Sequence, residues 1–264
     1  LIFLPIGISF YTLSAIGYMA DVYWGKVKAE YSLVKTALFL GFFPVIVEGP
    51  ICRWEDVEDT LFKNESVKAE NVFKGCYRII WGLFKKMIIA DRLAVLVDKV
   101  YVGYESYSGA VIVAAAISYT IQLYMEFSGC MDMVIGSAGL FGIRLPENFS
   151  QPFFAKTCTD FWKRWHITLG VWFKNYIFYP VSISKTARKW NKFTRKHFKG
   201  DFGKYVARMG IAAMALFPVW ISNGLWHGPK WNYIFYGLYY FGLIFMGLAL
   251  EPVRDRILAV LHIN

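Results

Sequence analysis

Apolar segments long enough to cross a membrane alternate with short polar segments along most of this chain of 264 residues. A helix that spans a bilayer needs about 20 mainly apolar residues. The segments that approach or exceed this length are 1–23, 31–51, 72–90, 109–127, 205–225 and 231–250. This pattern predicts an all-α fold and a polytopic membrane protein.

Two of these segments carry features that a simple lipid-facing helix would not tolerate. Lys85 and Lys86 lie in the middle of the third segment, and each lysine at the bilayer centre costs roughly 2.5–3.5 kcal/mol. We therefore expect this segment to be tilted, interfacial or turned toward a hydrated cavity. Residues 109–127 continue into Ser128 and Gly129, where we expect the helix to break before a short second helix.

Residues 157–180 combine Trp, Lys, Arg and His within an apolar region. Thr157 and Asp160 form a helix-start signature, so we expect one helix to run from Thr157 to Pro180. Aromatic and apolar residues at helical spacing would form one stripe along it, and His166 would face bulky rings on the adjoining stripe. The stripe residues are Phe161, Trp165, Leu169, Trp172 and Tyr176.

A strongly basic segment with a single acid, Asp201, follows this helix. Its basic residues are Lys185, Arg188, Lys189, Lys192, Arg195, Lys196, Lys199 and Lys204. The positive-inside rule predicts that this segment is a cytoplasmic loop. The next span would then run outward and place His227 toward the far face of the membrane.

The composition agrees with a membrane protein. Hydrophobic residues make up 56% and charged residues 18%, against about 45–50% and about 25% in soluble domains. The net charge of +10 fits an anionic lipid surface better than nucleic acid, because the basic residues lie between apolar segments. The four cysteines lack metal-ligand spacing and are expected to be buried free thiols. Because the chain begins within an apolar run, we expect one membrane domain over residues 1–264, a fragment without its N-terminal spans, with or without C-terminal ones.

Two histidines in apolar surroundings are candidates for chemistry. His166 follows Trp165 and His227 follows Trp226, and an apolar span favours the neutral imidazole, which can act as a base. Either histidine could instead only hydrogen-bond a neighbouring helix. The sequence has no GxSxG, P-loop, GxGxxG or HExxH motif, which excludes serine-elbow hydrolases, NTP-driven pumps and zinc proteases. Acyl transfer with a histidine base and proton-coupled transport both stay open.

Charged residues near these histidines have two interpretations each. Asp132 and Glu126 could orient a histidine or line a tunnel, or they could cap the broken helix. Lys163 and Arg164 could hold a phosphate of coenzyme A or of a carrier's phosphopantetheine arm. Alternatively, their side chains extend to the membrane interface.

Ordered sequence blocks along essentially the whole chain resemble the membrane-bound O-acyltransferase (MBOAT) family. They are Leu4-Pro5-Ile6-Gly7-Ile8-Ser9-Phe10-Tyr11, Asp21-Val22-Tyr23, Phe42-Phe43-Pro44 with Glu48-Gly49-Pro50, Lys85-Lys86 with Ala90-Asp91-Arg92, Phe127-Ser128-Gly129 with Asp132-Met133, Phe141-Gly142-Ile143-Arg144 with Pro146-Glu147-Asn148-Phe149, Phe161-Trp162 with Arg164-Trp165-His166-Ile167-Thr168-Leu169, and Leu225-Trp226-His227-Gly228. The branch they resemble contains bacterial alginate O-acetyltransferase membrane subunits, with the D-alanyl transfer protein of teichoic acid modification as a near relative. Glu126 and Cys130 stand where that branch usually has Asp and Tyr, which leaves the acceptor open.

The resemblance implies a multi-helix bundle around a central tunnel, with broken and re-entrant helices. It implies an acyltransferase of the bacterial inner membrane that takes an acyl group, acetyl in the first instance, from a cytoplasmic thioester such as acetyl-CoA or an acyl carrier protein. The acceptor would be a hydroxyl of an exported or cell-wall polysaccharide, or a periplasmic or extracellular transferase partner. No bound cofactor or metal is expected. Alternatives are D-alanyl transfer to a teichoic acid-like polymer and a non-catalytic translocator of acyl groups or protons.

The resemblance also assigns roles to particular residues. His227 and His166 map to the family's acyl-transfer centre. The expected substrate-binding residues are Trp165, Trp226, Arg164, Lys163, Asp132 and Glu126.

Overall fold

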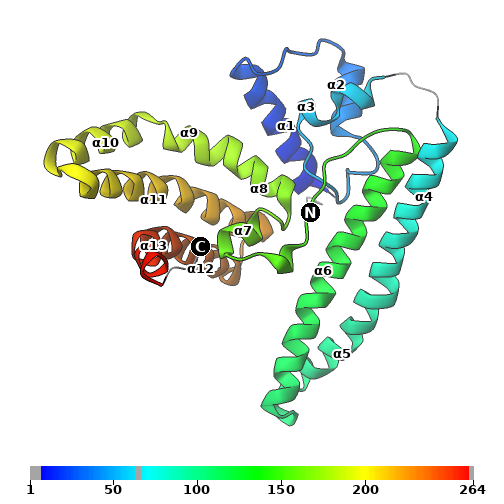
Figure 1. The fold of residues 1–264 in the computed structure, drawn as a ribbon. Helices are drawn as coiled ribbons and strands as arrows, with labels where there is room; N and C mark the ends of the chain where they lie inside the picture. The colour runs from blue at the N-terminus through cyan, green and yellow to red at the C-terminus, as the bar shows by residue number, and fades with distance from the viewer. Residues whose placement is uncertain (1–6, 64–66, 262–264) are drawn as a thin grey trace. The chain divides into compact units, whose positions relative to one another are not determined.

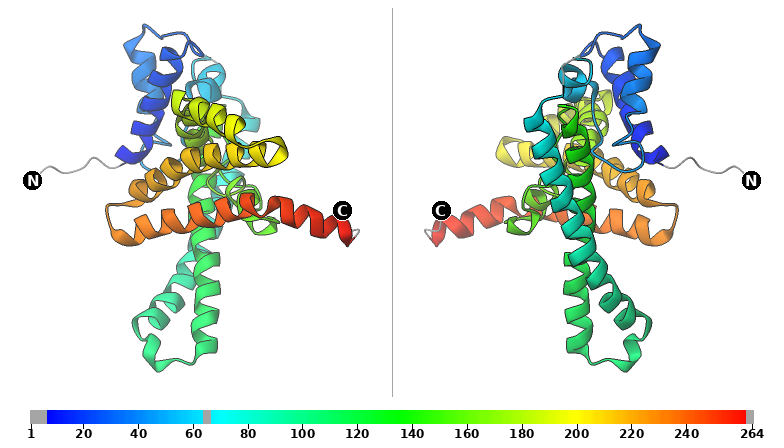
Figure 2. Two further views of the ribbon diagram at one scale, coloured as in Figure 1. Left: turned by 90° about the vertical axis from the view of Figure 1, so that its left-hand side faces the viewer. Right: turned by 90° about the vertical axis from the view of Figure 1, so that its right-hand side faces the viewer.

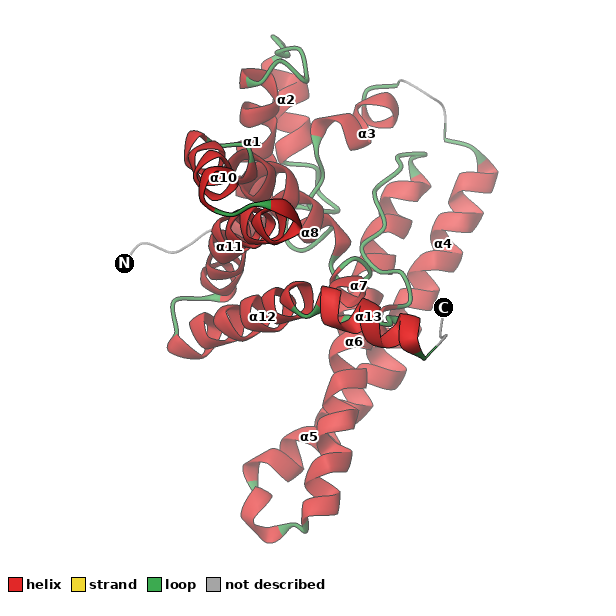
Figure 3. Cartoon of the chain, turned by 60° about the vertical axis from the view of Figure 1, so that its left-hand side comes forward, coloured by secondary structure: helices red, strands yellow, loops and turns green. Residues whose placement is uncertain are grey.

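The computed structural model describes residues 7–63 and 67–261, and its regular elements within these ranges are helices (Figure 1). Figure 3 shows helices joined by loops throughout this part of the chain. The chain divides into two compact units. Unit 1 comprises residues 1–150 with 165–168, and unit 2 comprises residues 151–164 with 169–264. The all-α prediction is confirmed.

Unit 1 is built from six α-helices and two short helices of other types within its described residues. They are α1 (Ile8–Tyr23), α2 (Leu33–Leu40), α3 (Trp54–Leu61), α4 (Ala69–Leu83), the π-helix η1 (Phe84–Ala90), α5 (Asp91–Val102), the 3-10 helix η2 (Tyr104–Ser106) and α6 (Gly109–Leu140). Unit 2 contains η3 (Pro152–Phe154), α7 (Cys158–Trp162), most of α8 (Ile167–Phe173), the π-helix η4 (Lys174–Phe178), α9 (Tyr179–Ser182), α10 (Lys185–His197), α11 (Gly200–His227), α12 (Trp231–Ala249) and α13 (Glu251–Val260).

Three of the described helices, α6, α11 and α12, are long and apolar enough to cross a membrane. They contain or closely match the spans expected at 109–127, 205–225 and 231–250. The prediction of a span over residues 31–51 is wrong, because α2 ends at Leu40 and is followed by Gly41 and irregular backbone. For the span expected at 1–23, the structure has α1 from Ile8, and residues 1–6 lie outside the described residues.

The predicted break at Ser128 and Gly129 is also wrong, since α6 is continuous from Gly109 to Leu140. Its glycines instead allow α6 to approach α4 closely, and the two helices lie side by side in Figures 1 and 2. A Cβ atom on Gly82 would lie 2.5 Å from the carbonyl oxygen of Gly129. One on Gly136 would lie 2.8 Å from the carbonyl oxygen of Gly75. Side chains at these positions would push the helices apart.

The single helix expected over 157–180 is divided in the structure, so the continuous aromatic stripe is wrong. The start is as expected, because the Thr157 hydroxyl accepts a hydrogen bond from the Asp160 N–H at 3.0 Å. However, α7 ends at Trp162, and α8 begins only at Ile167. Between them, His166 adopts a left-handed backbone conformation with φ of 47°, which a helix cannot continue through.

The basic segment expected to be a loop contains α10, a helix of 13 residues. The Ser184 hydroxyl caps it by accepting from the Ala187 N–H at 3.2 Å. Lys and Arg are good helix formers, and α10 packs along α11, with the Trp190 ring directly over Gly210. A strongly charged segment is therefore helical because one face of it is covered.

Candidate active site around His166 and His227

His166 is buried in unit 1 and held at its Nδ1 atom. Its relative exposure is 5%, and Nδ1 lies 3.1 Å from Oδ1 of Asn148. The ring of Phe127 meets the imidazole edge to face, with centroids 4.8 Å apart. His166 therefore does face a bulky ring, but this ring belongs to α6 and not to the helical stripe on which the sequence placed His166.

Asn148 is the centre of a hydrogen-bond cluster that joins three segments far apart in the sequence. It is fully buried, with 0% exposure. Its Oδ1 accepts from the Thr168 backbone N–H at 3.1 Å and from the Thr168 hydroxyl at 3.0 Å. The same hydroxyl accepts from the Ile51 N–H at 3.0 Å. The segments that contain Ile51, Asn148 and Thr168 therefore meet at one buried point.

Asn148 and Thr168 are site residues that the sequence does not reveal. In the sequence they belong only to the blocks that resemble the family. A buried amide in a loop can be inferred from sequence only when its distant partners are known. The one available signal was that the block around Asn148 and the block around His166 belong to the same family pattern.

Trp165 lies in an aromatic cluster beside this hydrogen-bond cluster. Its backbone forms an isolated antiparallel bridge with Phe149, and the two rings meet at right angles with centroids 5.1 Å apart. Phe127 and Tyr124 of α6 complete the cluster at 6.5 and 6.0 Å from Trp165. These rings shield one side of the His166 cluster from water.

Asp132 lies in an ion-pair network and not at a helix cap, because α6 has no break there. Lys85 Nζ is 2.6 Å from Asp132 Oδ2, and Arg78 Nε is 3.0 Å from Asp132 Oδ1. Arg78 also binds both carboxylate oxygens of Glu147, at 2.7 and 2.6 Å. The network links α4 and α6 to the residue that precedes Asn148.

Lys86 and Glu126 form a second pair in unit 1. Lys86 Nζ lies 2.6 Å from Glu126 and 2.8 Å from Asp91. Both lysines that looked costly in an apolar segment therefore have carboxylate partners, which offset their desolvation. Substrate binding by Asp132 and Glu126 stays a prediction.

His227 is the last residue of α11 in unit 2. It is surrounded on one side by rings: its imidazole centroid is 4.9 Å from Trp226, 6.1 Å from Tyr233 and 5.7 Å from Tyr236. The apolar sequence around it suggested burial, but His227 is exposed in the structure. The helix ends there because Gly228, with φ of 147°, turns the chain toward α12.

The aromatic surroundings of His227 continue to Trp162 of α7. The Tyr236 ring contacts both His227 and Trp162, with centroids 5.7 and 6.4 Å away. Trp162 also packs on Trp220 and Tyr240, at 5.1 and 4.8 Å. An aromatic cluster in unit 2 therefore connects the start of the 157–180 segment to His227.

The two expected phosphate-binding residues lie just after α7. Arg164 Nε is 3.0 Å from Asp160 Oδ1, and this hydrogen bond holds the pKa of the Asp160 carboxyl below its usual value. Lys163 is exposed. Arg164 is therefore held within unit 2, whereas Lys163 is available to an anion.

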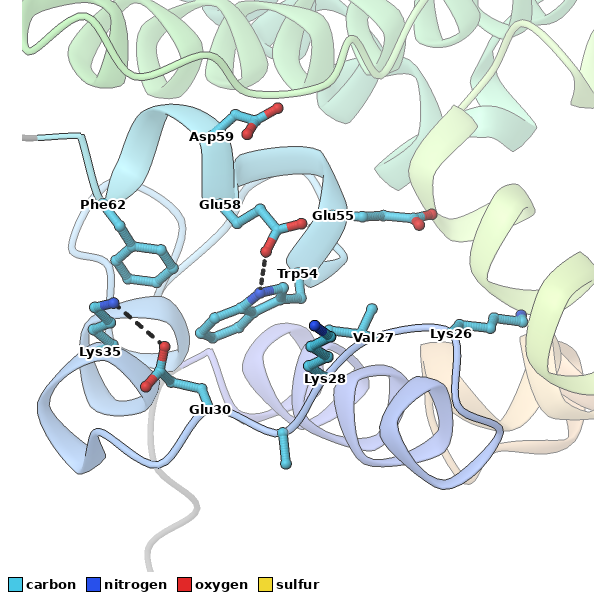
Figure 4. Close-up of a pocket in the computed structure, with 11 residues that line it drawn as sticks. Lys26, Val27, Lys28, Glu30, Lys35, Trp54, Glu55, Glu58, Asp59 and Phe62 are labelled. Atoms are coloured by element: carbon cyan, nitrogen blue, oxygen red, sulfur yellow. Dashed lines mark hydrogen bonds and ion pairs between the residues drawn. The ribbon is translucent and has the colours of Figure 1, made fainter.

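A cleft of about 470 Å³ lies in unit 1, away from both histidines in the sequence (Figure 4). It is lined by Lys26, Val27, Lys28, Ala29, Glu30, Lys35, Trp54, Glu55, Glu58, Asp59 and Phe62. Its polar groups largely bind each other: Trp54 Nε1 donates to Glu58 at 2.6 Å, and Lys35 pairs with Glu30 at 3.4 Å. The Ser32 N–H and Lys35 hold the pKa of Glu30 below its usual value. We interpret these contacts as structural: they hold the segment that follows α1 against α3.

These features define an all-helical membrane protein with one histidine in a buried hydrogen-bond cluster and a second at the end of an apolar helix. Within the described residues, no group of His, Cys, Asp and Glu has the arrangement of a metal site. Residues 26–197 match the membrane-bound O-acyltransferase family, and the chain belongs to this family.

Named relatives refine this placement. The chain is 36% identical over 239 residues to a probable alginate O-acetylase AlgI of Pseudomonas putida, an alignment that covers 90% of this chain and 44% of that protein. It is 32% identical over 281 residues to a peptidoglycan O-acetyltransferase of Helicobacter pylori, covering 95% and 47%. It is 29% identical over 241 residues to a teichoic acid D-alanyltransferase of Bacillus subtilis, covering 89% and 56%. The chain thus spans about half the length of these relatives, and the resemblance to this branch of the family is confirmed.

Proposed function

We propose that the full-length protein is an O-acyltransferase that moves an acyl group, acetyl in the first instance, from a thioester to hydroxyls of an exported or cell-wall polysaccharide. The observation that carries the proposal is the buried cluster that fixes His166 in a chain of the MBOAT family. Two of the relatives above are named as O-acetylating proteins. Donor, acceptor and position in the bacterial inner membrane are parts of the proposal.

In the proposed reaction, the acceptor hydroxyl loses its proton to a histidine as its oxygen attacks the thioester carbonyl carbon. The new C–O bond forms, the C–S bond breaks, and the histidine returns the proton to the leaving thiolate. His227 is the proposed general base and His166 acts with it at the reacting centre. Trp165 and Trp226 would wall the site, and Lys163 and Arg164 would hold a phosphate of the donor.

The donor would be acetyl-CoA or an acyl carrier protein that approaches from the cytoplasm, with no bound cofactor. The similarity to a teichoic acid D-alanyltransferase supports a second candidate, transfer of D-alanine from a carrier protein to a wall polymer. A periplasmic or extracellular transferase that receives the acyl group is a further form of the same proposal. Lipids would surround α6, α11 and α12.

The test is thioester consumption and acyl transfer by purified full-length protein, with labelled acetyl-CoA, an acetylated carrier and a D-alanylated carrier as separate donors. General-base catalysis contributes about 10²–10⁴-fold, so His227→Ala should lose nearly all transfer at unchanged thermal stability. His197, which is exposed on α10, provides the matched control, and His197→Ala should stay active. Wild-type turnover by His227→Ala would refute the assignment, and a protein that consumes no thioester with any donor would favour the translocator.

A further inference from the structure

The orientation of the Asn148 amide follows from its neighbours. The Thr168 backbone N–H can only donate, so the amide atom 3.1 Å from it must be the acceptor, Oδ1. The other end, Nδ2, then faces the sulfur of Met131 at 3.1 Å, which is a weak acceptor. The reversed amide would place an N–H donor against the Thr168 N–H. The oxygen of Asn148 therefore faces His166.

This orientation determines which nitrogen of His166 carries the proton. Nδ1 lies 3.1 Å from an oxygen that only accepts, so Nδ1 is the donor. In the neutral imidazole, one nitrogen carries hydrogen and the other carries the lone pair. The lone pair of neutral His166 is therefore on Nε2.

The cluster is built so that Asn148 cannot turn away. Its backbone oxygen accepts from the Ile167 N–H at 3.0 Å while its side chain binds His166 and Thr168. The preceding residue, Glu147, is held by two hydrogen bonds from Arg78 of α4. Backbone and side chain together thus hold residues 166–168 against the irregular segment that follows α6.

We propose that Asn148 is a positioning residue for acyl transfer, which keeps His166 in the Nδ1–H tautomer and directs the Nε2 lone pair to the reacting groups. In this state Nε2 of His166 accepts a hydrogen bond at the reacting centre, where His227 is the proposed general base. The Asn148 oxygen accepts from Nδ1 whether His166 is neutral or charged, so the ring keeps its orientation throughout the reaction. The catalytic part of this inference rests on the proposed function, whereas the tautomer does not.

The test combines a spectroscopic and a kinetic measurement on full-length protein purified in detergent. Nitrogen NMR of protein with ¹⁵N-labelled histidine distinguishes a protonated ring nitrogen from one with a lone pair, and the His166 signals are those absent from His166→Gln. In wild type we expect a protonated Nδ1 and an unprotonated Nε2. Because displacement of a reacting group can cost about 10²-fold, we expect Asn148→Ala to lower kcat by about that factor with little change in KM, and to populate the other tautomer.

Two variants separate positioning from folding. Asn148→Asp keeps an oxygen acceptor of the same shape and should retain the Nδ1–H tautomer and recover kcat to within about 10-fold of wild type. Thr168→Val removes a hydroxyl from the same cluster but keeps the backbone N–H of residue 168. Asn148 therefore keeps its orientation, and the His166 tautomer should not change. If Asn148→Ala does not fold, the tautomer in the wild-type spectrum and the tautomer and kcat of Asn148→Asp test the proposal. A wild-type Nε2–H tautomer, or an Asn148→Ala enzyme with unchanged kcat and tautomer, would overturn the proposal. A correct tautomer in a protein without transfer activity would instead refute only the proposed function.

Discussion

Removal of the Asp132 carboxylate should destabilise the protein far more than removal of its lysine partner. The two side chains are nearly equally buried, with 14% exposure for Lys85 and 13% for Asp132, and their charged atoms are 2.6 Å apart. Loss of one member of a buried ion pair costs about 3–5 kcal/mol, because the other charge is left without compensation. Partial exposure places our expectation for Asp132→Ala at the lower end, about 3 kcal/mol. Lys85→Met should cost about 1 kcal/mol, since Asp132 keeps Arg78 at 3.0 Å.

The assay is reversible unfolding in mixed detergent micelles, with the free energy of unfolding measured for each single variant and for the double variant. Residues in direct contact couple by about 0.5–3 kcal/mol, and we expect a value in the upper half of that range. Lys74→Ala is the matched control, because the pair of Lys74 with Glu70 is exposed on both sides and should show no measurable change. Equal, small effects of Asp132→Ala and Lys74→Ala would refute the reasoning, and so would a cycle without coupling.

Two further predictions concern topology and helix packing. A cysteine introduced at Lys192 of α10, in a variant without the native cysteines, should react with an impermeant thiol reagent only from the cytoplasmic side; labelling in intact cells would reverse the proposed orientation of His227. Gly129→Ala should destabilise the protein by about 1–3 kcal/mol, because a Cβ there would lie 2.8 Å from the Gly82 carbonyl oxygen. The same change at Gly109, where a Cβ meets nothing within 4 Å, is the control, and equal stability of the two variants would contradict the packing argument.

The sequence predicted those parts of the fold that depend on local composition. α6, α11 and α12 are evident from length and hydropathy because a lipid-exposed helix must be apolar along its whole span. The N-cap of α7 was also predictable, since the Thr157 hydroxyl binds the N–H three residues further on. By contrast, Gly129 has two opposite local interpretations. A glycine permits a break but also permits close helix packing, and only the presence of Gly82 on α4 decides between them.

The candidate site was predictable only as a set of residue types. His166 and His227 stood out because histidine is rare in apolar segments, but the arrangement around His166 depends on contacts with no local pattern. The Ile51 N–H reaches Thr168 across 117 positions of the chain. The left-handed backbone at His166 likewise has no signature in a run of aromatic and basic residues that fits a helix well. Tertiary hydrogen bonds overrode the helical periodicity there.

The ion-pair network around Asp132 and the hydrogen-bond cluster around His166 give two polar residues, Asp132 and Asn148, different expected roles. Arg78 binds both Asp132 and Glu147, so a contribution of Asp132 to catalysis would pass through Arg78 and Glu147 to the position of Asn148. Variants of Asp132 should therefore lower thermal stability first, with kcat per folded molecule nearly retained. Asn148→Ala should lower both, because its oxygen accepts from His166 and from two groups of Thr168, and a misplaced histidine can cost about 10²-fold in rate. Comparison of stability and kcat in the same preparations tests this division. A low kcat in folded Asp132→Ala would instead support the substrate-binding role that the family resemblance implies for Asp132.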